Sequence, residues 1–542
     1  MCSIGRIGAE SGMLRGFCNL TGSDMRILSN GLALLAGLSC VFGFAPFGFF
    51  PVPVLALGVL FVLWSRAMTP GEAARLGFSF GLGLFSAGIG WIYVALHDFG
   101  AMSAWLAVPA TLLFAAFLSL FTALSGYLQA RVPVDYAPRT ILVMPAVWVA
   151  VEWLRGMIFT GFPWLTLGYA HSDSPLAGYA PLLGVYGVSL VAAAGSGLLA
   201  FIFINVLAQK KAVLLSIPVR VALAVLLALW AGGVKLRGMS WTQPVGAPIS
   251  VTLVQGNISQ DIKFRDEAMV ETLESYRRLV MQNPARLTIL PETALPMFRE
   301  EVPQDLVEQL RDQARLNEGD VLVGVFERDR AGYYNSVIAL GASEDGFADA
   351  PQHYRKHHLV IFGEFIPLRP VLGWIINEVL HIPMGDLARG EAVQAPMKVA
   401  GQRVAVNICY EDVFGEEIIR ALPEATLLVN VTNDGWYGDS HAAAQHNQIS
   451  RFRALETGRM MLRATNTGVT SIIGVNGKIL QQLPQHQQGV LQGKVQGYEG
   501  STPYVRLGNW AVWLLIVLLL AGAWGWSRKL FPAFPVFFHR RR

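Results

Sequence analysis

The sequence predicts a polytopic α-helical membrane domain joined to an α/β domain that faces water. Two observations support this fold class. The 542 residues are 53% hydrophobic and only 15% charged, which is too apolar for one soluble globular protein. The charges are also unevenly placed, because residues 1–235 hold 12 Lys/Arg and 7 Asp/Glu, whereas residues 236–506 hold 25 and 31. The chain therefore combines a basic, apolar part with a mildly acidic, soluble part.

Eight segments are candidates for membrane spans, each of which needs about 20 mostly apolar residues. A Gly/Pro/Phe-rich stretch divides the charge-free run 27–65 into two spans, and six more are expected at 76–97, 99–130, 140–151, 174–209, 212–234 and 507–527. The fifth is the weakest, because Glu152 and Arg155 follow it at once. Its helix must end near these two residues or bury them. We therefore expect seven spans before the soluble part and one after it.

The basic residues of the short loops predict the orientation of these spans. Lys and Arg occupy every second connection and the final tail, and such residues favour the cytoplasmic side. Both termini are therefore expected in the cytoplasm and the soluble part on the opposite side. The predicted divisions are an N-terminal extension whose true start is Met1 or Met25, a membrane domain, a soluble domain, an eighth helix and a basic tail (1–25, 26–235, 236–506, 507–530 and 531–542).

Composition also excludes several classes of protein. A nucleic-acid binder carries clustered Lys/Arg, whereas the soluble segment is net acidic. The four cysteines lie far apart without a CxxC pair, so that we expect no disulfide framework, no metal and no cofactor. A transporter with an external domain would need polar groups inside its spans, where Glu152, Arg155 and Arg220 are nearly all that the sequence offers. Nothing demands an oligomer, and we expect a monomer.

Short β-branched runs alternate with amphipathic segments from residue 249 onward, which is typical of an α/β domain. Strands are predicted at 249–255, 286–291, 320–327, 335–341, 403–408, 426–431 and 469–474, and helices at 266–282, 304–316 and 442–462. In such domains, reactive residues gather at the carboxyl ends of the strands.

Three segments beside predicted strands carry reactive residues. Glu292 follows LTILP, Lys356 lies in HYRKHH, and Cys409 follows RVAVNI. A thiol with a pKa of about 8.5 is mostly protonated at neutral pH, so that a nucleophilic cysteine needs a base or a cation nearby. A glutamate can take the thiol proton, while a lysine and a backbone N–H can stabilise an oxyanion. Each residue alone has an ordinary structural explanation, but together they indicate nucleophilic catalysis.

Glu292, Lys356 and Cys409, in this order, resemble the Glu-Lys-Cys triad of the nitrilase superfamily. That resemblance implies an αββα sandwich and a thioester acyl-enzyme. The spans, together with GFPWLTLGYA, LVQGNISQDIKF, FGEFIP, NDGWYGDS, ALETGRMMLRATNTG and TPYVRLGNW, resemble the apolipoprotein N-acyltransferase family. The family resemblance implies a bacterial inner-membrane enzyme with a periplasmic catalytic domain. Such an enzyme transfers an acyl chain from a phospholipid to the α-amino group of the S-diacylglyceryl cysteine of an apolipoprotein, so that its partners are the donor, the acceptor and the bilayer.

The resemblance also implies roles for individual residues. Glu292 would be the general base, Lys356 the oxyanion group and Cys409 the nucleophile. The supporting or substrate-binding residues would be Glu364, which stabilises the triad, Tyr410, Glu411, which supports the base or binds the amine, Trp436 at the entrance, Phe264 near the acyl chain, and Trp164 at the outer membrane face. Two positions depart from the family pattern, because Phe264 stands where Trp is usual and Ile361 where Pro is usual.

One enzymatic alternative uses the same triad. A membrane-tethered nitrilase-type amidase would hydrolyse a small amide, but it would need a single anchor and not eight spans.

Overall fold

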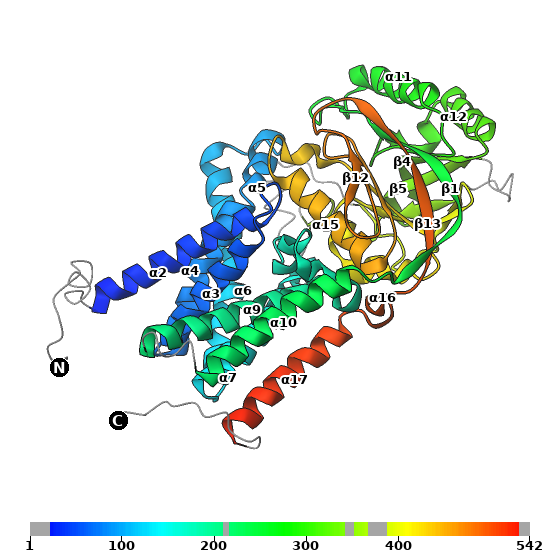
Figure 1. Cartoon of the computed structure of the whole chain (residues 1–542). Helices are drawn as coiled ribbons and strands as arrows, with labels where there is room; N and C mark the ends of the chain where they lie inside the picture. Colours follow the sequence, from blue (N-terminus) through cyan, green and yellow to red (C-terminus); the bar gives the residue numbers. More distant parts are fainter. Residues whose placement is uncertain (1–21, 210–215, 342–351, 362, 367–386, 530–542) are drawn as a thin grey trace.

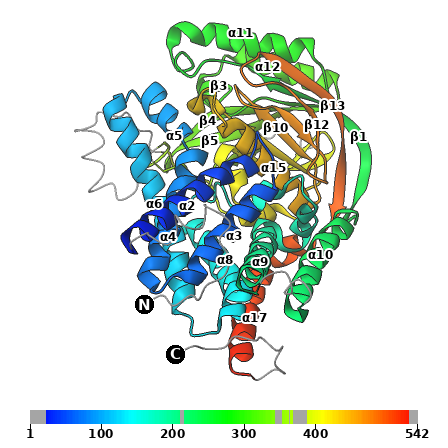
Figure 2. The same ribbon diagram turned by 60° about the vertical axis from the view of Figure 1, so that its left-hand side comes forward.

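The computed structural model describes residues 22–209, 216–341, 352–361, 363–366 and 387–529 (Figure 1). The first 21 residues of the predicted N-terminal extension and the predicted basic tail lie outside these ranges. The described chain forms a bundle of helices and a sheet-rich part, which lie side by side in both views (Figures 1 and 2).

Every one of the eight predicted apolar segments contains helix. The helices of the bundle are α2 (Gly22–Ser39), α3 (Pro51–Arg66), α4 (Pro70–Gly88), α5 (Trp91–Val94), α6 (Ala104–Arg131), α7 (Tyr136–Pro138), α8 (Met144–Arg155), α9 (Ala180–Gln209), α10 (Ile217–Arg237) and α17 (Trp510–Ser527). Within the described residues, six helical segments are long and apolar enough to cross a membrane. The pair Pro70–Gly88 and Trp91–Phe99, bent by 53°, makes a seventh if it is one span, and α3 is shorter. The predicted count of eight spans is therefore not established.

Helix α8 both ends at the two charged residues of the weakest predicted span and buries them. The side chains of Glu152 and Arg155 are 5% and 4% exposed. The Arg155 guanidinium donates to the carbonyls of Phe162 and Trp164, and the Glu152 carboxylate accepts from the N–H of Leu167 at 2.8 Å. The charges therefore fix the loop that follows α8, as buried charges need partners.

Two sheets form the core of the other part. The first has the order β13-β1-β2-β4-β5-β6 with β3 beside β4, and the second has the order β12-β11-β10-β9-β8-β7. Their strands are β1 (Thr242–Gln255), β2 (Leu287–Ile289), β3 (Leu295–Phe298), β4 (Asp320–Asp329), β5 (Gly332–Gly341), β6 (His353–Arg355), β7 (Met397–Val399), β8 (Gln402–Ile408), β9 (Leu427–Thr432), β10 (Met461–Thr465), β11 (Ser471–Ile473), β12 (Ile479–Gln482) and β13 (Gly489–Gly500).

Helices cover the outer face of each sheet, so that the layers follow the expected αββα order (Figure 1). On the first sheet lie α11 (Asp266–Gln282) and α12 (Gln304–Leu316), and on the second lies α15 (Ala442–Thr457); the short helices α14 (Gly415–Ile418) and α16 (Pro503–Leu507) complete the domain. Successive residues of a strand point to opposite faces. In β4, Leu322 belongs to the core between the sheets, whereas Val321 and Val323 pack toward α12.

The helix predicted over 442–462 is wrong beyond residue 457. Gly458 has a φ of 65°, the left-handed conformation that ends α15, and Met461–Thr465 then forms the buried strand β10, parallel to β9. The strand β13 was also not predicted, because its sequence is rich in Gln and Gly. It pairs with β1 from Thr242 to Gln255 through backbone hydrogen bonds that any sequence can make.

Replacing the glycine that ends α15 is expected to destabilise the domain. In Gly458→Ala, the new Cβ would lie 2.5–2.8 Å from side-chain atoms of Thr242, and an L-residue in this conformation costs about 1–2 kcal/mol. We expect a lower thermal unfolding midpoint than for Gly489→Ala, whose Cβ would meet its nearest neighbour at 3.6 Å. Equal midpoints for the two variants would contradict this account.

Candidate active site

Cys409 lies at a sharp turn between β8 and the 3-10 helix η11 (Cys409–Val413). Its φ is 54°, a strained value for a residue with a side chain, and such strain often marks a functional site. The thiol is buried. Burial and the negative charge of Glu292 raise its pKa, while Lys356 lowers it. The thiol is therefore protonated at rest, and its reaction needs a proton acceptor.

Glu292 is the residue that we expect to accept the proton of the thiol. It follows β2 and is 7% exposed. Its Oε1 accepts from the Asn335 amide at 2.8 Å and from Lys356 Nζ at 3.3 Å, and its Oε2 accepts from the N–H of Asn433 at 2.8 Å. These three donors hold the carboxylate in one orientation, as a general base requires.

Lys356 follows β6 and is held between two carboxylates. Its Nζ lies 2.7 Å from Glu364 Oε1 and 3.3 Å from Glu292 Oε1, and its side chain is 1% exposed. Burial lowers the pKa of Lys356, but the charges of Glu364 and Glu292 outweigh burial and hold that pKa well above its usual range. The group is therefore a fixed ammonium, and Glu364 is the carboxylate nearest to it.

Glu411 ties the turn of Cys409 to the loop of Lys356. Its Oε1 accepts from the N–H groups of His357 and His358 at 2.7 and 3.0 Å, and its Oε2 accepts from Ile408 N–H and the Tyr354 hydroxyl at 2.7 and 2.9 Å. With two donors on each oxygen and 2% exposure, the carboxylate has no position left for an amine. Of the two expected roles, its geometry favours support of the site.

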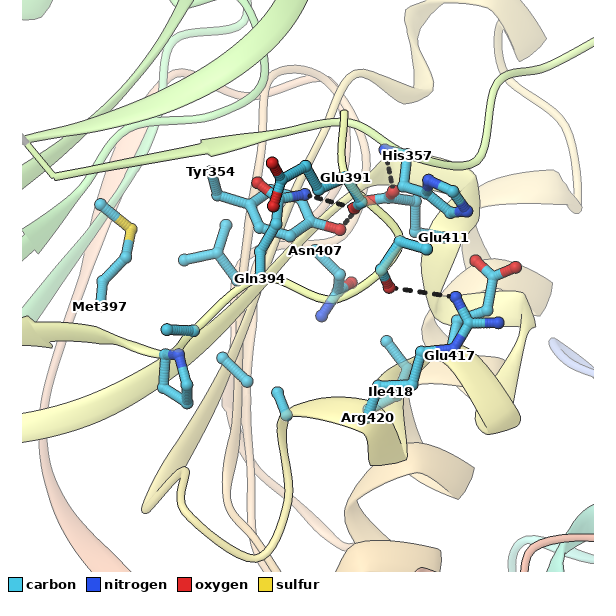
Figure 3. A pocket seen from close by; sticks show the side chains of 16 residues that line it. Tyr354, His357, Glu391, Gln394, Met397, Asn407, Glu411, Glu417, Ile418 and Arg420 are labelled. Atoms are coloured by element: carbon cyan, nitrogen blue, oxygen red, sulfur yellow. Dashed lines mark hydrogen bonds between the residues drawn. The ribbon is translucent and has the colours of Figure 1, made fainter. Parts of the chain in front are cut away.

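A small pocket lies beside Glu411 and is separate from the triad (Figure 3). The residues that line it include Tyr354, His357, Asn407 and Arg420, but not Cys409, Glu292 or Lys356. This pocket is therefore not where the thiol would react.

Truncating Glu411 is expected to slow every step that uses the site. Glu411→Ala would leave the buried N–H of Ile408 unpaired and free the loop after Lys356, and a buried donor without its partner costs about 1–3 kcal/mol. We expect acylation of Cys409 and transfer to an amine to fall together, in single-turnover assays of each step. Loss of transfer with normal acylation would show that Glu411 binds the amine instead.

Lys263 is a residue of the site to which the sequence analysis assigned no role. Its Nζ donates to the Glu292 carbonyl at 3.1 Å and to Thr293 Oγ1 at 2.7 Å, and Thr293 has a φ of 45°. Burial lowers the pKa of Lys263 to about 8, although Glu292 and Cys409 oppose the shift. The lysine thus holds the turn that carries Glu292. Its position next to Phe264 was the one feature of the sequence that could have indicated a role in the site. The sequence does not show, however, that the lysine side chain points into the site.

Two of the predicted aromatic residues are exposed. Trp436 is 43% exposed, and its ring lies 6.3 Å from that of Phe99, in the bent segment after α5. Phe264 is 50% exposed. Trp436 therefore lies partly exposed where the catalytic part contacts the bundle of helices.

Trp164, which was predicted at the outer membrane face, is buried inside the protein and does not face lipid. It is 1% exposed, its indole N–H donates to Gln445 of α15 at 2.7 Å, and its ring is stacked 6.3 Å from that of Tyr410. The Tyr410 hydroxyl donates to the carbonyl of Gly161 at 3.1 Å. Both residues therefore join the loop after α8 to the turn of Cys409, and the loop is buried because the catalytic part covers it.

Known proteins are similar to both parts of this chain. A family model of the apolipoprotein N-acyltransferase N-terminal domain matches residues 36–198, and a carbon-nitrogen hydrolase model matches residues 250–504. A CN-hydrolase superfamily protein from Xanthomonas campestris aligns over 50% of this chain and 97% of its own, with 20% identity and a TM-score of 0.35. By the two family models, the chain is a carbon-nitrogen hydrolase domain joined to apolar helices, in a membrane protein.

Curated relatives narrow this class to one family. An apolipoprotein N-acyltransferase from Nitrosomonas europaea is 49% identical over 91% of this chain and 96% of its own, and one from Methylococcus capsulatus is 43% identical over 88% and 92%. The chain belongs to the apolipoprotein N-acyltransferase family, and it is an acyltransferase. The resemblance seen in the sequence is therefore confirmed.

Proposed function

We propose that the protein transfers an acyl chain from a membrane phospholipid to the α-amino group of the N-terminal S-diacylglyceryl cysteine of apolipoproteins. The observation that carries this proposal is the buried site of Cys409, Glu292 and Lys356 on a chain with at least six apolar helical segments long enough to cross a membrane. The names of the relatives supply the class of the acceptor, and the phospholipid donor is our proposal.

The first step forms a thioester on Cys409. Glu292 takes the thiol proton as the sulfur attacks the carbonyl carbon of the phospholipid ester. The Lys356 ammonium and the N–H of Tyr410 stabilise the oxyanion of the tetrahedral intermediate. The intermediate collapses to the thioester, and Glu292 returns the proton to the departing oxygen of the lysolipid.

The second step releases the acyl chain to the lipoprotein. The neutral α-amino group attacks the thioester carbon, Glu292 takes a proton from the nitrogen, and the sulfur leaves and receives that proton. Water would hydrolyse the same thioester, so that transfer requires a site from which water is excluded. The burial of the thiol favours an acyl chain over water, and we propose that the exposed ring of Trp436 lies at the entrance to the site.

The membrane explains why one chain contains both parts. We propose eight spans, with the shorter helix α3 and the bent pair α4 and α5 among them, both termini in the cytoplasm and the domain 236–506 in the periplasm of the bacterial inner membrane. The alternation of basic loops supports this orientation. Both substrates are lipids, and the bilayer would deliver them to a monomeric enzyme in two dimensions.

Incubation with a labelled phospholipid and a diacylglyceryl peptide tests the proposal. We expect the label on the peptide α-nitrogen, detected by mass spectrometry, and none when phospholipid is omitted. Hydrolysis of a small amide in the absence of phospholipid, without N-acylation, would favour the membrane-tethered amidase.

A further inference from the structure

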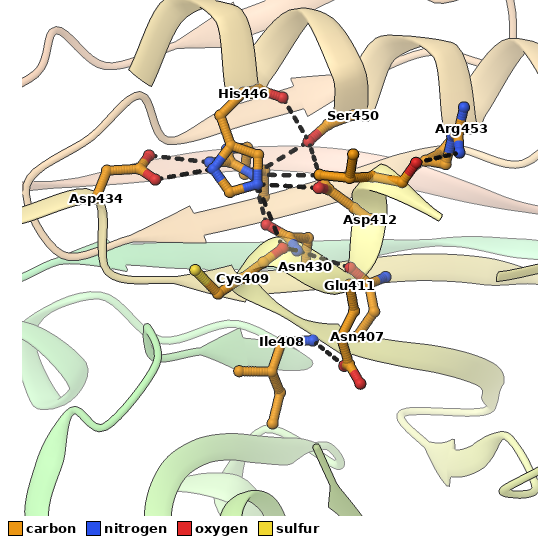
Figure 4. Close-up of polar contacts among 12 residues, drawn as sticks. Asn407, Ile408, Cys409, Glu411, Asp412, Asn430, Asp434, His446, Ser450 and Arg453 are labelled. Carbon is orange, nitrogen blue, oxygen red and sulfur yellow. Dashed lines mark hydrogen bonds and ion pairs between the residues drawn. The ribbon is translucent and has the colours of Figure 1, made fainter. Parts of the chain in front are cut away.

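A cluster of buried charges lies beside the backbone of Cys409 (Figure 4). His446 of α15 contacts two aspartates, since its Nδ1 is 2.9 Å from Asp434 Oδ1 and its Nε2 is 2.9 Å from Asp412 Oδ1. Arg463 of β10 also contacts both carboxylates, at 2.9 and 3.4 Å. The proposed mechanism assigns no role to this cluster.

The charges of the cluster balance when His446 is an imidazolium. Two aspartates then face one histidine and one arginine, and all four side chains are at most 2% exposed. Burial and Arg463 lower the pKa of His446, but Asp412 and Asp434 outweigh them and raise it to about 9. Both ring nitrogens therefore carry protons, and each can donate.

The imidazolium also reaches the nucleophile. Its Nε2 proton is shared between Asp412 Oδ1 at 2.9 Å and the carbonyl oxygen of Cys409 at 3.3 Å, and the amide of Asn430 donates to that carbonyl oxygen at 3.1 Å. That carbonyl belongs to the same planar peptide group as the N–H of Tyr410. Donors on the oxygen fix the plane and, by polarising the amide, strengthen its N–H as a donor.

We propose that His446 is a positioning residue that fixes and polarises the Cys409–Tyr410 peptide group, and thereby the N–H that stabilises the oxyanion. The inference rests on the proposed function, because it needs an oxyanion formed at Cys409. The strained φ of 54° at Cys409 shows why the peptide needs outside support.

The helix that carries His446 is itself anchored. The neighbouring Gln445 accepts from the indole N–H groups of Trp164 and Trp91 at 2.7 and 3.3 Å, and the ring of Trp164 lies 5.4 Å from the imidazole. The donor to the Cys409 carbonyl therefore sits on a helix fixed against the membrane part.

Replacing His446 by glutamine or by asparagine tests the contacts of its two ring nitrogens separately. A glutamine amide can place its nitrogen near the former Nε2, and an asparagine amide near the former Nδ1. His446→Gln therefore keeps a donor for the Cys409 carbonyl and loses the bond to Asp434, whereas His446→Asn does the reverse. We expect His446→Asn to lower the single-turnover acylation rate at saturating phospholipid about tenfold and His446→Gln about threefold or less, with half-saturation unchanged in both.

The thermal unfolding midpoints of both His446 variants show whether a slower reaction reflects a misplaced peptide group or a less stable fold. Ser471→Ala is the matched control, because it removes a buried hydrogen bond to Asn447 of the same helix at 2.8 Å without touching the cluster. Asn430→Ala removes the second donor to the Cys409 carbonyl and is expected to slow acylation by a similar factor. The inference would be overturned by equal acylation rates for the two His446 variants or by a normal rate for Asn430→Ala. It would also be overturned if the acylation rates of the variants fell in proportion to their thermal unfolding midpoints.

Cys409→Ala in the same assay tests the proposed function separately. An acyl adduct that persists in this variant would refute the thioester on Cys409. Its absence, together with equal rates for the two His446 variants, would refute the role of His446 alone.

Discussion

Cys409→Ala is expected to abolish the acyl-enzyme and to lower N-acylation by at least about 10⁴-fold, as losses of a covalent nucleophile do. The sulfur of Cys409 receives the acyl chain in the first step of the proposed reaction and releases it in the second. Glu292 and Lys356 remain in the variant, but neither can carry the acyl chain, because each is held by hydrogen bonds in its present role. Intact-mass analysis after incubation with phospholipid measures the adduct directly.

A second buried cysteine provides the control. Cys40 lies in the membrane part and donates weakly to the carbonyl of Ala36, with no catalytic group beside it. Cys40→Ala is expected to keep the adduct and the transfer rate. An adduct in Cys409→Ala, or its loss in Cys40→Ala, would mean that Cys409 is not the nucleophile.

Elements whose signal is local were predictable from the sequence. The helices α11 and α12 begin and end where their amphipathic patterns do, and strands such as β4 and β8 follow their apolar runs. The place of Cys409 at the end of β8 was predictable for the same reason, but its catalytic role was indicated only by its combination with Glu292 and Lys356.

Elements that depend on distant partners were not predictable in this way. Residues 461–465 continue the apolar pattern of α15, and only the pairing with β9 makes them a strand. Asn335, which orients Glu292, is a polar residue of β5 that precedes Ser336 and the apolar run 337–340. A polar residue in a predicted strand can be expected to have a hydrogen-bond partner, but nothing in the sequence identified Glu292, 43 residues away, as that partner.

The contacts between the two parts of the chain were also not predictable, because they depend on distant partners. Trp164 beside Pro163 looked like an aromatic residue at a membrane surface, because that is where Trp is common. The partner that buries it, Gln445, lies 281 residues further on. A residue at the boundary of two domains can be assigned to lipid or to protein only when both domains are in view.

Glu292→Gln is expected to lower acylation of Cys409 about 10³-fold, within the range usual for a lost general base. The shape of the side chain is kept, but an amide cannot take the thiol proton. The amide NH₂ would also face one of the present donors, either Asn433 N–H on one side or Asn335 and Lys356 on the other. Glu308→Gln, on the exposed face of α12, is the matched control and is expected to react at the normal rate.

The pH dependence of the residual rate identifies what Glu292 supplies. Without a base, only thiol that has already ionised can attack. Burial, with Glu292 adding to it in the native protein, raises the pKa of Cys409 above its usual range, and burial remains in the variant. Below that pKa the thiolate fraction rises about tenfold per pH unit, so that the Glu292→Gln rate should climb steadily between pH 6 and about 9. In the native protein the carboxylate accepts the proton during attack, and the rate should depend less steeply on pH. Parallel pH profiles for the two proteins would show that Glu292 holds the site together without acting as its base.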